Sequence, residues 1–151
     1  METNNKNNTA AFINLSTLTQ YFIPFGNFIF PIIIWTTNKD KSGFVDRQGK
    51  DTINFQLSLF LYSLLLALIA IPTLLIGLFK DANFSAIINH DDLVFDNFSM
   101  GAHTGLLTFG IIAVALFGFI KVAEFFLIIH ASIKTSNGDA YKYPLTIPFI
   151  K

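Results

Sequence analysis

The sequence contains no cysteine and little charge of either sign. Without cysteine the chain has no disulfide framework, no thiolate metal site and no thiol catalysis, and its composition leaves the redox compartment open. Charged residues make up 13% of the chain, against roughly 25% in ordinary soluble proteins. Ten basic and ten acidic residues cancel, so no general electrostatic attraction to nucleic acid is expected. Nucleic acid is therefore excluded as a partner.

Apolar residues are what the chain has in abundance. They make up 52% of its 151 residues and include 18 phenylalanines, and the mean hydropathy is +0.54. Phenylalanine offers a large apolar surface that needs no hydrogen-bond partner, which suits contact with acyl chains. The length corresponds to about one domain. The composition therefore predicts an integral membrane protein whose partner is the lipid bilayer.

Three apolar regions are long enough to be considered as membrane spans. Two of them, about 52–79 and 105–134, exceed the roughly 20 apolar residues that a helix needs to cross a bilayer, and we expect a transmembrane helix in each. The third region, about 12–36, contains Pro24 and Pro31. Because proline removes a backbone hydrogen bond, this region is either one kinked span or a re-entrant hairpin that turns near Pro24.

The predicted fold class is an all-α integral membrane protein with about three transmembrane helices. Residues 1–10 are polar and rich in asparagine, and they lack the basic region and the cleavage pattern of a signal peptide. We expect them to form a disordered tail. The remainder, 11–151, is predicted to form a single helical membrane domain.

The distribution of lysine and arginine predicts the orientation. The 38–50 loop carries four of these cations, the C-terminal tail carries three, and the 80–103 loop carries Lys80 alone. Cationic loops tend to stay in the cytoplasm. We therefore expect a multi-pass protein of the bacterial inner (cytoplasmic) membrane, with the 38–50 loop and the C-terminus in the cytoplasm and the 80–103 loop outside.

Lys121 and Glu124 form the main candidate for a functional site, because both interrupt the third apolar region. Residues spaced i, i+3 lie on one face of a helix, so the two charges are expected to pair. An ionisable residue inside a membrane is by default a candidate for an ion path or a binding site. The alternative is that the pair only neutralises itself and fixes how its helix packs.

Other chemical motifs are weak or absent from the sequence. His90 and His103 lie in the 80–103 loop near three aspartates, but their spacing is not that of a zinc site. No phosphate-binding loop, nucleophile elbow or dinucleotide fingerprint occurs. We therefore predict no catalytic residues, no metal, no cofactor and no enzymatic activity.

Three stretches of the sequence resemble a known family. They are Leu15-Ser16 with Phe22 to Gly26 and Phe30 to Trp35; Lys39 to Lys50 running into Asn54-Phe55-Gln56; and Ile133-Lys134 with Asn137 to Asp139 and Tyr141 to Pro144. In this respect the chain resembles the bacterial domain-of-unknown-function family numbered four-eight-seven-zero, itself distantly similar to the twenty-kilodalton Tic subunit of the chloroplast import translocon. The resemblance implies a membrane domain of a few helices and brings no established activity.

The residues shared with that family gather at the predicted cytoplasmic face. This cytoplasmic-face cluster comprises Trp35, Asp46, Arg47, Asn54, Gln56, Tyr141, Tyr143 and Pro144. The amides of Asn54 and Gln56 would be unpaired in lipid, so we expect them to bond to backbone of the first region or of the Tyr143-Pro144 segment. The cluster is interpreted either as a cap over the helix ends or as a docking surface for another protein.

Two functions are compatible with these features. The first is a small inner-membrane subunit or accessory of a larger membrane complex, with a role in protein transport or insertion by family analogy alone. Its partners would be another integral membrane protein or further copies of itself. The alternative is a subunit of an oligomeric small-solute or ion transporter or channel that uses the pair of Lys121 and Glu124.

Overall fold

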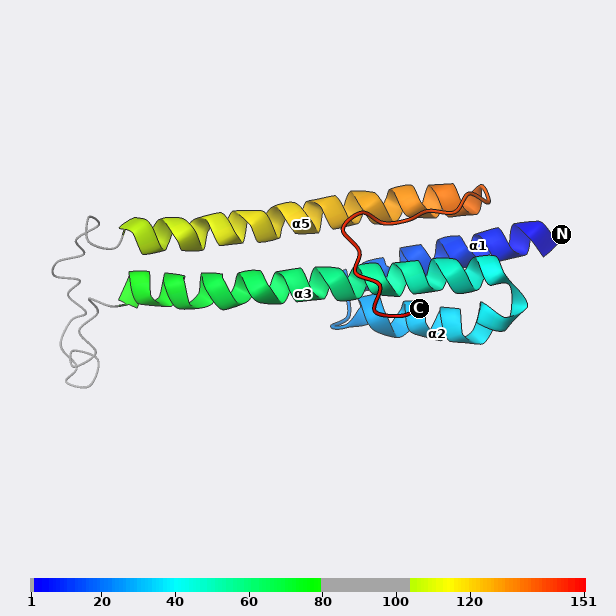
Figure 1. Ribbon diagram of the computed structural model, residues 1–151, viewed down its shortest axis with the longest axis horizontal. Coiled ribbons are helices and arrows are strands. Elements are labelled where there is room, and N and C mark those ends of the chain that lie inside the picture. Colours follow the sequence, from blue (N-terminus) through cyan, green and yellow to red (C-terminus); the bar gives the residue numbers. More distant parts are fainter. Residues whose placement is uncertain (1, 80–103) are drawn as a thin grey trace. The chain divides into compact units, whose positions relative to one another are not determined.

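The computed structural model describes residues 2–79 and 104–151, and all its regular elements in those ranges are helices. In chain order they are α1 (Glu2–Ser16), the 3-10 helix η1 (Thr17–Tyr21), α2 (Gly26–Asn38), the 3-10 helix η2 (Lys39–Lys41), α3 (Gly43–Phe79) and α5 (Thr104–Ser136), as Figure 1 shows. The all-α prediction is confirmed. The predictions for the 80–103 loop, including His90 and His103, lie outside the described residues.

Among the residues that the structure describes, α3 and α5 are the two helices long and apolar enough to cross a membrane, over Gly43–Ile76 and Thr104–Ser136. Only 6% and 17% of their most apolar windows are buried inside the protein. The core helix of a soluble protein would be mostly buried, so these exposed apolar faces fit contact with lipid. Both begin well after the N-terminus, unlike a signal sequence. α3 also continues through Pro72, as membrane helices often tolerate.

The first apolar region is two short helices and not one span. η1 ends at Tyr21, the chain turns over 22–25, and α2 begins at Gly26. Phe25 adopts a left-handed backbone with φ 60°, and a Cβ on Gly26 would lie 2.8 Å from the Thr19 carbonyl carbon. The turn is therefore tight, and α1 and α2 pack against each other as a hairpin (Figure 1).

This hairpin corrects the count of about three spans. The single kinked helix over 12–36 is wrong, because the chain reverses direction after η1, while the two-helix alternative agrees with the backbone. α2 has 13 residues and continues through Pro31. At about 1.5 Å per residue it is shorter than the roughly 30 Å hydrocarbon core. Two candidate spans remain in the described part of the chain.

Residues 2–10 belong to helix α1, where the sequence predicted a disordered tail. The reason is that the helix has one buried side despite its polar composition. Asn7, Ala10 and Asn14 are all less than 9% exposed, and their spacing of three and four places them on one helical face. Burial along this face orders a segment whose asparagine content is typical of disorder.

The chain divides into two compact units, Met1–Tyr62 with Ile120–Lys151, and Ser63–Phe119. We call the first the polar-cored unit and the second the apolar unit, and we describe each by itself. α3 and α5 contribute to both units. Whether 11–151 behaves as a single membrane domain stays a prediction.

The polar-cored unit is built around the first part of α3. Five consecutive residues, from Thr52 to Gln56, are all buried, which requires that other segments cover α3 on every side. Phe55 stacks on Tyr143 of the C-terminal segment with ring centroids 4.1 Å apart. Ile128 and Ala131 of α5 complete this apolar cluster. α5 and the C-terminal segment thus enclose α3.

The apolar unit buries very little. Among the described residues of this unit, Ala70 and Ala113 are the buried apolar ones, and a Cβ on Gly110 would lie 2.6 Å from the Leu74 side chain. Small residues thus let the two helical segments approach closely. The large side chains that remain exposed are Leu64, Leu65, Leu68, Ile69, Ile71, Leu75, Ile76, Leu106, Phe109, Ile111, Ile112, Val114, Leu116, Phe117 and Phe119.

Candidate functional site

The predicted ion pair between Lys121 and Glu124 forms on α5, within the polar-cored unit. Lys121 Nζ lies 2.8 Å from Glu124 Oε2. The Glu124 side chain is fully buried, whereas that of Lys121 is 33% exposed. A buried carboxylate needs a compensating charge, and Lys121 supplies it from one turn away. The pair is therefore asymmetric, with its anion inside the protein and its cation at the edge.

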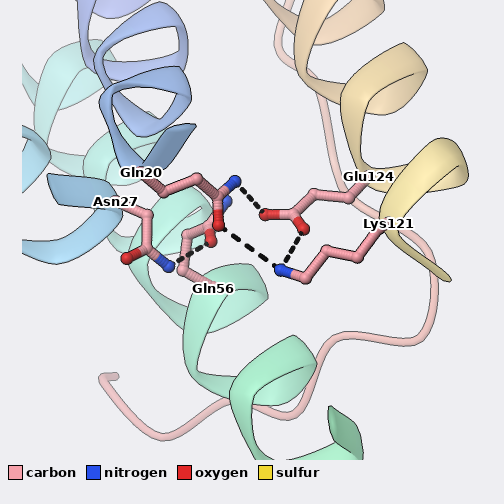
Figure 2. A network of polar contacts seen from close by, with 5 residues as sticks. All are labelled: Gln20, Asn27, Gln56, Lys121 and Glu124. Carbon is pink, nitrogen blue, oxygen red and sulfur yellow. Dashed lines mark hydrogen bonds and ion pairs between the residues drawn. The ribbon is translucent and has the colours of Figure 1, made fainter. Parts of the chain in front are cut away.

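Gln20 of η1 completes this site. Its Nε2 donates to Glu124 Oε1 at 2.8 Å, and its Oε1 accepts a longer bond of 3.4 Å from Lys121 Nζ. Figure 2 shows the three side chains pointing toward one another from η1 and α5. Both carboxylate oxygens of Glu124 therefore have a donor. No local pattern in the sequence indicates the role of Gln20, because its partners lie about a hundred positions away in the chain.

A pocket of about 440 Å³ borders the pair and is lined by Tyr21, Lys121, Val122 and Phe125. Tyr21 and Phe125 meet edge to face, with centroids 6.5 Å apart. The walls are aromatic and aliphatic except for the lysine. The pocket therefore places the ammonium group of Lys121 beside an apolar surface. The aliphatic part of the lysine side chain can lie along lipid while the ammonium group stays paired with Glu124.

A second polar contact lies beside the first, between α2 and α3 (Figure 2). Asn27 Nδ2 donates to Gln56 Oε1 at 2.8 Å. Gln56 is 1% exposed, and its Nε2 has no hydrogen-bond partner among the described residues. The predicted bond from Gln56 to backbone is wrong, since its partner in the first region is a side chain.

The cytoplasmic-face cluster separates into several contacts. Trp35 Nε1 donates to Asp46 Oδ1 at 3.0 Å, and Asp46 also pairs with Lys50 at 2.7 Å. Gly49 lies directly under the Trp35 ring, where a Cβ would be 2.2 Å from a ring carbon. Arg47 is exposed. Trp35 thus attaches α2, to which it belongs, to the first turns of α3.

The other members of the cluster belong to the C-terminal segment and its contacts with α3. Asn54 exchanges two bonds with the Ile150 backbone, donating to its carbonyl at 2.9 Å and accepting from its N–H at 2.8 Å. Ser58 Oγ accepts the Ile147 N–H at 2.8 Å, and Tyr62 donates to the Leu145 carbonyl at 2.9 Å. Positions 54, 58 and 62 share one helical face. The polar side chains on this face of α3 form hydrogen bonds with backbone groups of the extended C-terminal segment. Asn54 bonds to backbone as expected, but at Ile150 and not at the Tyr143-Pro144 segment.

We call residues 141–150 of the C-terminal segment the strap. Tyr143 of the strap is buried, Tyr141 is partly buried and Pro144 is exposed. Tyr141 meets Tyr143 edge to face at 5.0 Å, and the Tyr141 N–H donates to Gln48 Oε1 at 3.3 Å. Burial raises the pKa of the Tyr143 hydroxyl far above its usual range, and the neighbouring Tyr141 adds to this effect. The C-terminal segment is therefore an integral part of the polar-cored unit.

Asn14 is the centre of this unit, and the sequence analysis did not identify it. The residue is fully buried. Its Oδ1 accepts from Thr52 at 2.6 Å and from the Tyr143 hydroxyl at 2.8 Å, and its Nδ2 donates to Thr135 Oγ1 at 3.2 Å. One amide thus joins α1, α3, α5 and the C-terminal segment. The signal in the sequence is an asparagine that directly follows Ala11, Phe12 and Ile13.

In the part of the chain that the structure describes, no three His, Cys, Asp or Glu side chains gather to form a metal centre. The chemistry of the site is instead that of one buried ion pair and several bonded amides.

These features define a small helical membrane protein, with an exposed apolar unit and a polar-cored unit that contains a buried ion pair. The chain belongs to the magnetosome magnetite crystal formation protein family (MamF/MmsF), whose profile matches residues 5–150. It is therefore a small membrane protein involved in magnetosome magnetite formation. This match corrects the resemblance to family four-eight-seven-zero and to the Tic subunit, which is wrong. No curated protein and no solved structure matches the chain.

Proposed function

We propose that the protein acts as a non-enzymatic subunit or accessory of a membrane assembly that forms magnetite in the magnetosome. The family match supports the process, and the contrast between the two units supports the manner of action. A role in protein transport or insertion rested on the corrected resemblance and has no other support.

The observation that carries this proposal is how the buried polar groups are used. Asn14, Thr52 and Tyr143 bond to one another, and Asn54 bonds to the C-terminal backbone. Such contacts rigidify a unit and specify its structure. The apolar unit instead exposes large side chains on both of its helical segments. A rigid polar-cored unit, combined with helical segments that expose apolar side chains, suits a protein that is held in a membrane and positions the other components of an assembly.

The proposed orientation follows the loop cations and places the protein in the bacterial inner membrane or a membrane continuous with it. The 38–50 loop and the C-terminus would face the cytoplasm, and the 80–103 loop the opposite side. Lys6 of α1 lines one pocket together with Lys41 and Val45, so the start of α1 lies beside the start of α3. This favours a re-entrant hairpin whose two ends are on the same side as the 38–50 loop.

Two measurements test the proposal. Deleting the gene in a magnetite-forming host should change the size, number or shape of the crystals in electron micrographs, and the intact gene should restore them. Purification of the tagged protein from magnetosome membranes in mild detergent should recover a stoichiometric membrane partner. Unchanged crystals would contradict the role in magnetite formation, and a solitary protein would contradict the role as a subunit.

The second candidate function is a subunit of an oligomeric ion or small-solute transporter or channel, and the geometry of Lys121 and Glu124 favours it. A buried carboxylate beside a lysine that is one-third exposed could exchange a proton or bind an ion. Water bound to iron is acidic, so precipitating magnetite releases protons that have to be removed. Two spanning helices cannot enclose a pore alone, and this function would therefore need several copies.

Flux through proteoliposomes separates the two functions. The double variant Lys121→Leu/Glu124→Leu should abolish proton flux, measured with a trapped pH-sensitive dye, if the pair carries protons. The matched control is Asp46→Leu/Lys50→Leu, which removes an ion pair at the start of α3 and should leave the flux unchanged. Flux that persists in the first variant would contradict the transporter function and leave the pair a packing role.

A further inference from the structure

A second pocket in the polar-cored unit lies at the end where α3 begins. It has a volume of about 290 Å³ and is lined by Asn5, Lys6 and Thr9 of α1 and by Asn38, Lys41, Ser42 and Val45 of the segment that leads into α3. Its two walls are therefore far apart in sequence. The polar lining consists of amides, hydroxyls and two ammonium groups.

The charge of the lining has one sign. Among the described residues of the lining, Lys6 and Lys41 are the charged ones. Lys41 Nζ donates to the neutral Asn38 Oδ1 at 3.0 Å. Among the side chains described over 4–76 and 104–151, no ion pair joins either lysine to a carboxylate. Asp46, the nearest acidic residue of α3, is occupied by Lys50 and Trp35. Two cations in one pocket, with no carboxylate among its described lining residues, favour an anionic ligand.

The first turn of α3 adds to this preference. Ser42 and Val45 line the pocket, and the bond from the Asp46 N–H to the Ser42 carbonyl, 3.0 Å, opens the helix. The N–H groups before it have no partner within the helix, and they carry the positive end of the helix dipole. α3 is also a candidate span from Gly43 onward. A pocket at the start of a helix that spans the bilayer would lie near the lipid headgroups.

We propose that this pocket binds a phosphate group at the membrane surface, with Lys6 and Lys41 as its cationic ligands and Asn5 and Ser42 as hydrogen-bonding groups. Basic pockets next to membrane helices bind anionic headgroups, and hydroxyl and amide groups can donate to phosphate oxygens. The phosphate belongs either to an anionic phospholipid or to a soluble phosphate.

Native mass spectrometry of the protein in detergent tests this assignment. Phosphatidylglycerol added to the intact protein should give a retained adduct, and phosphatidylcholine, which has no net charge, should give much less. The variant Lys6→Gln/Lys41→Gln should weaken phosphatidylglycerol binding roughly 30-fold, since each cation near an anionic surface contributes about a factor of five. The variant Lys6→Arg/Lys41→Arg should restore most of the binding, which shows that the loss comes from charge and not from misfolding.

The matched control is Lys39→Gln/Lys134→Gln, which removes two lysines that do not line the pocket and should leave binding within about twofold of the wild type. Equal weakening in this control, or equal retention of phosphatidylcholine, would overturn the proposal. Inorganic phosphate then identifies the source. Displacement of the lipid by inorganic phosphate shows that the pocket recognises the phosphate alone, and retention against it shows that the site belongs to a lipid.

Discussion

The two units of this protein use their residues in opposite ways. In the polar-cored unit asparagine, threonine and tyrosine side chains are buried and bond to one another, and many large apolar residues lie outside them. In the apolar unit the described contacts are made by small residues, and the large residues face outward. In water the exposed large apolar side chains of the apolar unit would be unfavourable. In lipid neither unit's arrangement of side chains costs much free energy. The difference shows that the specificity of the fold resides in its buried hydrogen bonds and not in the amount of apolar surface.

The largest effect is expected from breaking the buried ion pair. Lys121→Met leaves the fully buried Glu124 carboxylate with Gln20 alone, and should lower the free energy of unfolding by about 3 to 5 kcal/mol. Thermal unfolding followed by circular dichroism in detergent measures the loss. Lys121→Met/Glu124→Met should recover much of it, because it removes the stranded charge. A single variant as stable as the wild type would contradict a structural role for the pair.

Removing the central amide should have the next largest effect. Asn14→Ala leaves the hydroxyls of Thr52 and Tyr143 without their shared acceptor and should cost about 3 kcal/mol. The matched variant in the apolar unit is Leu68→Ala, whose side chain is 62% exposed and which should cost no more than about 0.5 kcal/mol. Equal losses in the two variants would remove the distinction between the units.

These two variants also separate what the sequence predicts from what it does not. The long helices α3 and α5 follow from their apolar runs, because a span needs only local composition. Asn14 and Thr135 are bonded across 121 positions, and Asn54 and Ile150 across 96. Local patterns do not contain such pairings. The pair of Lys121 and Glu124 was predictable because its spacing is local, and its third member Gln20 was not.

The first region shows the same limit at shorter range. Pro24 and Pro31 made a break foreseeable, but the two prolines have opposite outcomes. Pro24 lies in the turn that ends at the left-handed Phe25, and Pro31 lies within α2. The difference depends on whether the chain packs closely on itself, as Gly26 does on Thr19. The order of residues 2–10 likewise depends on a buried face that is completed by distant segments.

Two glycines give an intermediate effect and a direct test of packing. Gly49→Ala places a methyl group 2.2 Å from the Trp35 ring, and should cost about 1 to 3 kcal/mol by overpacking. Gly118→Ala in the apolar unit meets nothing within 4 Å, and should be neutral or stabilise its helix by up to about 1 kcal/mol. Unfolding midpoints in detergent give both values. Destabilisation by Gly118→Ala would indicate that another protein surface packs there.

The smallest effect is expected from the Tyr143 hydroxyl, and it depends on pH. The native pKa is raised, so the folded protein keeps the proton while the unfolded chain loses it above a pH of about 10. Stability from this group is therefore intact below pH 10 and is lost as the pH rises beyond it. Tyr143→Phe should cost about 1 kcal/mol at neutral pH and should show a shallower loss at high pH. Parallel pH profiles for the two proteins would contradict the shift.

The strap of residues 141–150 has a consequence for the order in which the protein is made. Its contacts with Gln48, Asn54, Ser58 and Tyr62 join a segment that leaves the ribosome late to a helix that is inserted early. Asn14 therefore acquires the Tyr143 hydroxyl as a partner only after α1 and α3 have been synthesised. Until the strap packs against α3, the centre of the polar-cored unit lacks one of its hydrogen-bond donors.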